Sequence, residues 1–417
     1  MKKYLLALSA AAALFVPQLA GAEGFAVYEW SAEGMAMGGA RMFAEDDAAN
    51  MAYNPASITK VKGKALKVSA SYLSPHGRYD VTTRAGLKTG ENRVHPAWVP
   101  GMYYVQQIND KEWFGMGTYS RFGLISQFER NSPPGSNAFS SKLFGVSLGA
   151  NYARKLDKKW SASLGAELNY VGLQLDKNMG NVTPMHIEGE SYALGWNAAA
   201  NYEFDDKNEM GVVYRSKVNH SMEADYDMHN VKMLAAGMHL PSGSVPNSMY
   251  GDAYGCVTLP ESVSIGYNHK FNDKTRIELN GIWTRWERYD ALDMTFSPWL
   301  TGASGTVPSA KNWSNGWRYA LGLEHKLSNK YTALAGIAYD DHSIPYSGGD
   351  FMIPTGRRLT YSIGTQYHDD KQTLAVALGW MKVGGLDFAG GPTDTFGTAH
   401  TRDSFTKMAS ISYQRKF

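Results

Sequence analysis

Strict alternation of apolar and polar residues governs most of the chain after about residue 64. In the segment 192–204, one set of positions is aromatic or aliphatic and the other is small or polar. The same period of two recurs in the segments 144–152, 162–170, 263–271, 359–368 and 374–380. Successive side chains of a β-strand point to opposite faces, so this pattern predicts strands. The polar face is mostly Gly, Ala, Ser and Asn, which is typical of a lumen rather than a solvent-exposed sheet.

Short polar turns alternate with long connections along the same region. The turns are Asn109-Asp110-Lys111, Asp157-Lys158-Lys159, Asp205-Asp206-Lys207, Asn272-Asp273-Lys274, Ser328-Asn329-Lys330 and Asp369-Asp370-Lys371. Short periplasmic turns and longer extracellular loops are the signature of an outer-membrane β-barrel. Six turns and seven long loops predict 14 antiparallel transmembrane strands over residues 64–417, with both ends of the barrel on the periplasmic side.

Residues 23–63 lack this alternation and are the expected occupant of the lumen. They contain many small residues, the acidic run Glu45-Asp46-Asp47 and the step Asn54-Pro55-Ala56. Asn before Pro fits an N-cap followed by proline at the first helical position, and this purely structural role stays open. A barrel of 14 strands encloses more space than its own side chains fill. We therefore expect residues 23–63 to form a hatch that plugs the barrel.

The two ends of the chain predict export to the outer membrane. A basic start is followed by an apolar run to Leu19 and by the small residues Ala20-Gly21-Ala22. This order is typical of a signal peptide over residues 1–22, with Glu23 as the mature N-terminus. The last strand ends at Phe417, and an aromatic last residue resembles the signal that the barrel-assembly machinery recognises. The expected location is the bacterial outer membrane, among its lipid and lipopolysaccharide.

Composition and charge narrow the class of function. A net charge of +2 without a basic cluster gives no reason to expect a nucleic-acid partner. The single cysteine, Cys256, has no partner for an internal disulfide; a free reactive thiol and a residue without a role both remain open. The 11 His show no catalytic arrangement, so we expect no enzyme, no cofactor and no metal site. The expected assembly is a monomer.

The chain resembles the FadL/TodX family of outer-membrane transporters of long-chain fatty acids and other hydrophobic compounds. The resemblance is carried by Gly24-Phe25, residues 34–40, Asp46-Asp47-Ala48, Asn54-Pro55-Ala56, residues 214–218, 259–261, 318–322, 336–341 and 362–365, with Pro345 and Ile353-Pro354. It implies a 14-stranded barrel closed by an N-terminal hatch. One departure is Gly356-Arg357-Arg358, where relatives more often carry an acid-Arg-aromatic step, so ligand contacts near this loop are in doubt.

The resemblance also implies how the channel is gated. Asn54-Pro55-Ala56 would lie against a kinked wall strand, where a lateral opening lets ligand leave sideways into the membrane. Glu23, Gly24 and Phe25 would reach into the ligand pocket and move to release the cargo. The kinked strand would be the third, residues 113–123, in which Gly115, Gly117 and Gly123 either allow a bend or are simply small lumen-facing residues.

A fatty acid as cargo needs an apolar pocket and a cation for its carboxylate. The 19 Met and many aromatic residues supply adaptable apolar side chains. On the alternation, the basic residues that face inward are Arg121, Arg215, Lys217 and Arg318, which makes them candidate ligand contacts. Pairing of each with a carboxylate of the hatch or loops, such as Asp46 or Asp47, is the alternative. No ATP-binding motif is visible, so uptake is expected to be passive.

Three other functions fit part of the sequence. An aqueous porin with a surface-receptor role needs the same wall, but it has no use for residues 24–63. A barrel enzyme needs a nucleophile or paired acids with His, for which the sequence gives no pattern. Use of the long loops as an adhesin or phage receptor is not tested by sequence. The function that fits all segments is passive, ligand-gated uptake of long-chain fatty acids or similar hydrophobic molecules.

Overall fold

The computed structural model describes residues 24–417 except 238, 240–244, 301 and 303. The predicted signal peptide, residues 1–22, and the predicted N-terminal residue Glu23 lie outside this described part. Within it, no helix combines the length and the apolar character needed to cross a membrane.

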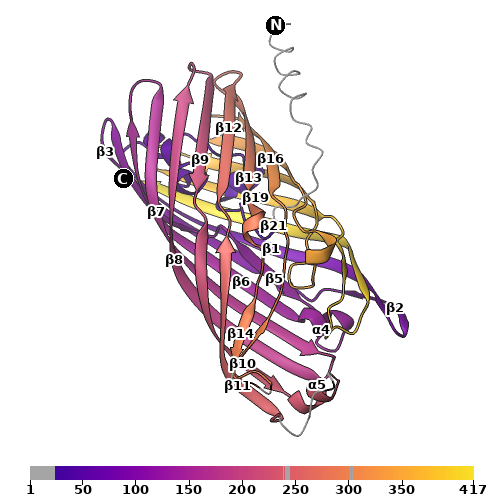
Figure 1. Cartoon of the computed structure of the whole chain (residues 1–417). Coiled ribbons are helices and arrows are strands. Elements are labelled where there is room, and N and C mark those ends of the chain that lie inside the picture. The colour runs from indigo at the N-terminus through magenta and orange to yellow at the C-terminus, as the bar shows by residue number, and fades with distance from the viewer. Residues whose placement is uncertain (1–23, 238, 240–244, 301, 303) are drawn as a thin grey trace.

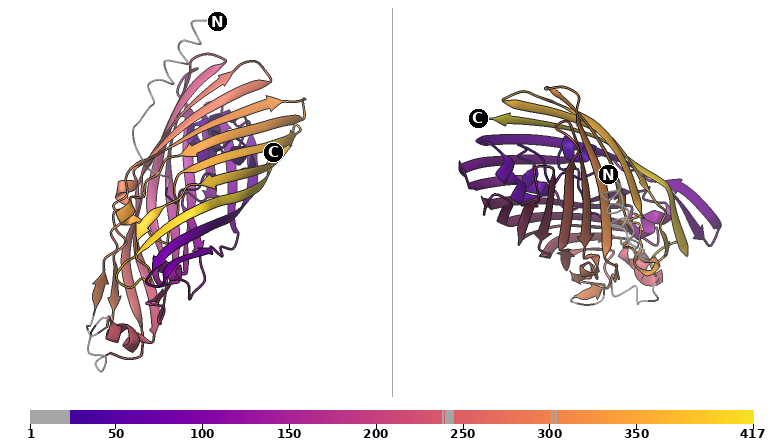
Figure 2. Two further views of the ribbon diagram at one scale, coloured as in Figure 1. Left: turned by 90° about the vertical axis from the view of Figure 1, so that its right-hand side faces the viewer. Right: turned by 90° about the horizontal axis from the view of Figure 1, so that it is seen from above.

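Fourteen antiparallel strands form a closed barrel, which confirms the fold expected from alternation and turns (Figures 1 and 2). The ring closes where the first and last strands, β1 (Lys64–Thr83) and β21 (Thr398–Lys416), pair with each other. Three wall strands are interrupted: β4 (Glu112–Tyr119) continues as β5 (Gly123–Gln127), β9 (Asn208–Arg215) as β10 (Val218–His229), and β11 (Ser248–Leu259) as β12 (Ser262–Lys270). The uninterrupted ones are β3 (Ala97–Asn109), β6 (Ser140–Lys155), β7 (Trp160–Met179), β8 (Thr183–Glu203), β13 (Thr275–Thr284), β16 (Gly316–Lys326), β17 (Tyr331–Asp340), β18 (Arg358–His368) and β19 (Gln372–Val383).

The six short turns gather at one end of the barrel, here the turn end, and the long connections at the other, the loop end. Several connections expected to be loops continue as paired strand; β7 and β8, for example, run to a hairpin at Met179 and Thr183. The smaller elements of the connections are β2 (Gly86–Glu91), β14 (Met294–Ser297), β15 (Gly305–Val307), β20 (Asp387–Ala389), α4 (Pro133–Ala138), α5 (Val231–Gly237), η3 (Trp286–Arg288) and η4 (Tyr346–Gly348).

The outer face of the wall is apolar, as a lipid-facing surface requires. Leu194 is 77% exposed and Ile363 is 64% exposed, both on the outside. The inner face carries small and polar residues, such as Asn151, Asn197 and Asn201, all of which are buried. Alternation therefore separates lipid from lumen along each strand.

Residues 24–63, here the N-terminal segment, lie inside this ring (Figure 2). The segment contains α2 (Ala32–Ala36), α3 (Asn50–Tyr53) and η1 (Pro55–Lys60), and all of it is buried except Glu45, Asp46, Lys60, Lys62 and Gly63. Its polar groups bond to strands around the ring: Ala32 N–H to Ser412 of β21, Gly38 C=O to Arg318 of β16, Ala36 C=O to Ser362 of β18, Asn54 to Asn201 of β8 and Val61 C=O to Trp113 of β4.

Glycines on the inner wall let this segment approach closely, which leads to a first prediction. A Cβ at Gly336 of β17 would lie 2.1 Å from the backbone carbon of Met37. Gly336→Ala is therefore expected to push α2 off the wall and to expose Arg41 to trypsin. Gly281→Ala is the matched control, because its Cβ would meet only Trp317, at 3.8 Å. Equal resistance of both variants to limited proteolysis would contradict the close contact.

Candidate functional site

Asn54 joins the N-terminal segment to the wall. Its side-chain oxygen accepts a hydrogen bond from Ala56 N–H at 3.1 Å, and its amide donates to Asn201 Oδ1 at 2.7 Å. Pro55 occupies the first position of η1, so the capping role expected from sequence is present. Asn54 bonds to β8, while η1 also contacts β4 of the third wall strand. Asn54-Pro55-Ala56 thus fixes the segment to several strands at once.

Buried ion pairs hold the N-terminal segment in the lumen near the turn end of the barrel. Lys67 Nζ of β1 contacts Glu33 Oε1 at 2.9 Å and Asp47 Oδ1 at 2.8 Å. Arg41 contacts Asp47 at 3.4 Å and Glu324 of β16 at 2.7 Å, and Arg276 of β13 shares Glu324 at 2.8 Å. These side chains, here the charge network, are almost entirely buried, so removal of one partner leaves an unpaired charge.

Arg121 and Arg215, two of the expected ligand contacts, point inward but share one protein carboxylate. Glu167 of β7 pairs with Arg215 and, at 3.3 Å, with Arg121. Arg215 also donates to the carbonyl of Ala52 at 2.6 Å. Two guanidinium groups face one carboxylate here, so one positive charge remains formally uncompensated within this cluster. The alternative expected from sequence, pairing inside the protein, applies to both residues.

Arg318 also points inward and is engaged by the protein. It pairs with Asp340 of the neighbouring strand β17 and donates to the carbonyl of Gly38 at 2.9 Å. Its guanidinium lies over the Tyr28 ring, 4.4 Å from the centroid. Arg318 therefore fastens the N-terminal segment to β16 and, as it stands, offers no free donor pair to a ligand.

The expectation that Lys217 faces the lumen is corrected, because Lys217 is exposed on the outside. The pairs Asn197 with Arg215 and Glu190 with Glu223 show one extra residue on the β9–β10 side, between Arg215 and Glu223. This bulge shifts the inward positions from odd to even numbers. The alternation used for Arg215 therefore does not extend to Lys217.

A second bulge lies in the third wall strand, at residues 120–122. Tyr119 pairs with Ser147 and Gly123 with Phe144, so three residues of this strand oppose two of β6. The kink expected at Gly115 and Gly117 is therefore misplaced, since both lie in regular pairing. They are small because a Cβ at Gly115 would lie 2.3 Å from Met51 Sδ. Gly123 directly follows the bulge.

The bulge leaves a gap in the wall. β3 pairs with β4 only as far as Thr118, and β5 pairs with β6 alone. A cavity of about 340 Å³ lies here, between the residues Leu73, Trp98, Leu124, Phe144 and Phe405 of the wall and Phe25, Val27 and Phe122 on the lumen side. Trp98 and Phe144 are 62% and 50% exposed on the outer face, whereas Phe25 is buried. The cavity thus borders both the lumen and the lipid-facing surface.

The start of the N-terminal segment covers this gap from inside. Gly123 N–H donates to Phe25 C=O and Val27 N–H donates to Arg121 C=O, both at 3.0 Å. Arg358, which belongs to the step Gly356-Arg357-Arg358 where the sequence differs from its relatives, donates to the carbonyls of Gly24 and, at 3.3 Å, of Ala26. The backbone of residues 24–27 is therefore held between the bulge and β18.

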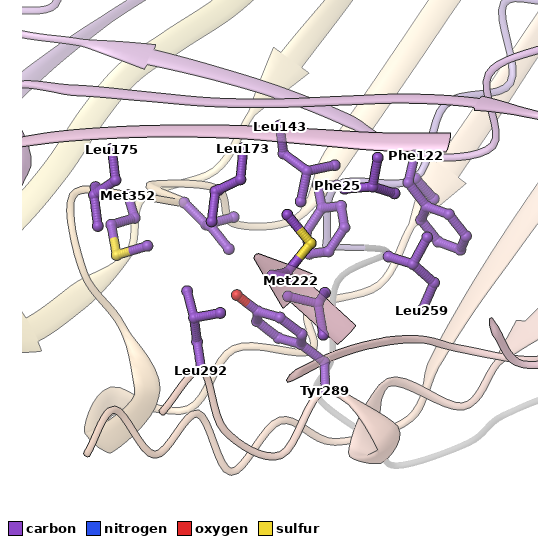
Figure 3. Packing of buried hydrophobic residues seen from close by; sticks show 14 of the residues in the cluster. Phe25, Phe122, Leu143, Leu173, Leu175, Met222, Leu259, Tyr289, Leu292 and Met352 are labelled. Atoms are coloured by element: carbon purple, nitrogen blue, oxygen red, sulfur yellow. The ribbon is translucent and has the colours of Figure 1, made fainter. Parts of the chain in front are cut away.

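The Phe25 side chain lies in a cage of aromatic rings. Its ring centroid is 4.9 Å from Trp286, 5.4 Å from Tyr289, 5.8 Å from Phe122 and 6.0 Å from Trp313. Figure 3 shows that the cage opens onto further buried apolar side chains, here the chamber, with the residues Leu143, Leu173, Leu175, Met222, Leu259, Leu292 and Met352. The loop half of the lumen thus holds the chamber, whereas the turn half holds the charge network beside small apolar clusters such as Met42, Phe43 and Ala56.

Two lysines that sequence reasoning missed lie at the loop end. Lys311 is buried and pairs with Asp350. Lys177, on the inner face of β7 beyond Leu175, makes no salt bridge within the described residues. Burial lowers the pKa of the Lys177 ammonium, although Asp394 and Asp350 act in the opposite direction. Burial alone would lower the pKa of Lys311 too, but Asp350 outweighs it and the pKa is raised.

A family model described as outer membrane protein transport protein (OMPP1/FadL/TodX) matches residues 13–385. The chain belongs to this family. Among its relatives, the long-chain fatty acid transport protein of Escherichia coli O6:H1 (strain CFT073) is 28% identical over 398 residues, which are 87% of this chain and 86% of the relative. Membership places the protein in the outer membrane and among transport proteins rather than enzymes.

Solved structures share the fold of this family member. A Pseudomonas aeruginosa FadL homologue superposes with a TM-score of 0.82 at 18% identity, over 94% of this chain and 100% of the homologue. The Pseudomonas putida toluene transporter TodX gives a TM-score of 0.72 at 16% identity, over 94% of this chain and 99% of TodX. The closed barrel described above is therefore the family fold.

Proposed function

We propose that the protein takes up long-chain fatty acids or similar hydrophobic molecules passively across the outer membrane. The observation that carries the proposal is the division of the lumen, with an apolar chamber at the loop end, a charge network at the turn end and the wall gap at their boundary. Long-chain fatty acid transport by a 28% identical relative supports the same cargo class. The toluene transporter TodX supports an aromatic hydrocarbon as the alternative cargo.

The chamber suits an alkyl chain. Each buried CH₂ group contributes about 0.8 kcal/mol, and flexible Met222 and Met352 adapt to chains of different shape. For a fatty acid, Lys177, which makes no salt bridge within the described residues, is the chain's own cation for the carboxylate at the chamber's loop end, since the neighbouring Lys311 is paired with Asp350. This assignment replaces Arg215 and Arg318, whose guanidinium groups are engaged by Glu167 and Asp340.

The N-terminal segment acts as the hatch in this proposal. An alkyl chain that continued towards the turn end would meet the tightly packed N-terminal segment, with the buried polar side chains of Asn54 and Asn201 and the charge network. Burial of most of the segment in the lumen supports this role over an aqueous porin, which needs an open pore. The cargo is instead expected to leave through the wall gap into the membrane, once Gly24 and Phe25 move away from the bulge.

Arg121 lies at this exit. It follows the bulge residue Ser120, and its cluster with Arg215 and Glu167 carries the uncompensated positive charge. We expect it to attract the carboxylate end towards the gap. Several modest sites in sequence favour passage, whereas one tight site would trap the cargo.

The experiment is uptake and binding of labelled oleate by cells and membranes that carry the protein or its Lys177→Met variant. The ammonium form binds a carboxylate, so oleate affinity of the wild type is expected to be highest below the lowered pKa of Lys177 and to fall as the pH rises through it. Lys177→Met is expected to bind oleate roughly tenfold more weakly than the wild type at the pH where the wild type binds it most tightly, the loss of about one charge-assisted contact, and to lack this pH step.

Lys232→Met is the matched control, because Lys232 of α5 is exposed. It is expected to retain wild-type affinity and pH dependence. Wild-type protein that confers no oleate or toluene uptake would refute the proposed function, whereas an unchanged pH profile in Lys177→Met would refute only the role of Lys177.

A further inference from the structure

Two tryptophans of the cage lack a hydrogen-bond partner for the indole nitrogen. Trp286 is fully buried and Trp313 is 4% exposed, and neither Nε1 meets an acceptor among the described residues. Buried polar groups are nearly always paired, because an unpaired one loses its hydrogen bonds to water without replacement. Two unpaired donors in one apolar cage therefore need an explanation beyond packing.

The two indole rings pack against each other and against Phe25. The ring centroids of Trp286 and Trp313 are 5.2 Å apart, and both rings contact Phe25. A Cβ at Gly24 would collide with both indoles, at 2.6 Å and 2.8 Å, so they form the surface on which the start of the N-terminal segment lies. A molecule that displaces Phe25 comes into contact with both tryptophans.

The charges around the cage favour an uncharged acceptor. Lys311 acts on the neighbouring Tyr289 but is already paired with Asp350. A carboxylate placed among apolar rings without its own cation is far more costly than a neutral oxygen that accepts one or two N–H donors.

We propose that Trp286 and Trp313 form a neutral oxygen-binding site, through which the chamber accepts uncharged oxygenated long-chain compounds such as alcohols, ketones and esters. The same site would take a fatty acid in its protonated form. The site adds a polar contact deeper than the lysines at the loop end. This inference rests on the proposed function, since it presupposes a hydrophobic cargo in the chamber.

The test compares 1-decanol, decane and decanoate as competitors of a fluorescent long-chain fatty acid, with the full barrel in lipid nanodiscs. The variant Trp286→Phe/Trp313→Phe keeps an aromatic ring at each position but removes the N–H donor together with part of each indole, and decane binding reports the effect of the lost ring volume. Two lost hydrogen bonds are expected to weaken decanol binding roughly tenfold, while decane binding stays within about twofold. A pH series separates the two forms of the acid, because only the protonated form should respond to the double variant.

Trp160→Phe is the control, because Trp160 lies 44% exposed on the outer face, and it is expected to leave the binding of all three ligands unchanged. Melting temperature is measured alongside to show that the barrel of the double variant stays folded, because two smaller buried rings leave empty space in the cage. Decanol binding that is unaffected, or that weakens only as much as decane binding, would overturn the inference while leaving hydrophobic uptake intact. A wild type that binds none of the three ligands would overturn the inference together with the proposed function.

Discussion

Lys67→Met is expected to loosen the N-terminal segment and to turn the barrel into a leaky pore. Lys67 is the partner of both Glu33 and Asp47, and all three side chains are at most 6% exposed. Removal of one partner from a buried ion pair costs about 3–5 kcal/mol, because the remaining charge stays buried. The measurement is single-channel conductance in planar bilayers, where frequent large openings are expected that the wild type lacks.

Lys270→Met provides the matched control. Lys270 contacts Glu45 of the same segment at 3.2 Å, but these side chains are 36% and 57% exposed. Exposed pairs contribute about 0–1 kcal/mol, so this variant should conduct like the wild type. If Lys67→Met remained as closed as Lys270→Met, the charge network would not be what holds the segment in the lumen.

Deletion of Ser120 is expected to reduce uptake of hydrophobic cargo at least about tenfold without unfolding the barrel. The bulge has one residue more than the facing part of β6, so the shortened strand pairs in regular register and the gap narrows. The measurement is uptake of labelled oleate, with folding checked by the heat-dependent shift of the barrel on gels.

Ser120→Ala keeps the length of the strand and is the control for the side chain itself. The carbonyl of residue 120, which accepts from Trp30 Nε1, is unaffected by this change. Ser120→Ala is expected to transport like the wild type. Undiminished uptake by the deletion variant would show that cargo does not need the bulge.

The wall could be predicted from the sequence because its signals are local. Alternation within single strands gives the lumen face, which places Arg121, Arg215 and Arg318 correctly, and the polar turns give the strand number. Lys217 could not be placed this way, because the bulge before it depends on the register with β8. The bulge at residues 120–122 could not be predicted from the sequence either, since Ser-Arg-Phe has no conformational preference that marks a break in a strand.

The chamber could not be predicted, because its residues come from connections that are distant along the chain. Lys177 lies near the end of β7, where a connection was expected to be a loop, while Lys311, Trp286 and Trp313 lie in the irregular connection between β13 and β16. Their proximity to Phe25 depends on how this connection folds over the barrel. Only the aromatic and methionine content hinted at an apolar site, without saying where it lies.

The central claim, that cargo enters the apolar chamber and leaves sideways, is tested most directly by photolabelling. An oleate analogue with a diazirine on its chain is illuminated with the protein in outer-membrane vesicles, and the adducts are located by mass spectrometry. The account predicts adducts on Phe25 and Phe122 inside the gap and on Trp98 and Phe144 outside it. Adducts on Asn201 and Lys60, on a straight path towards the turn end, would contradict it.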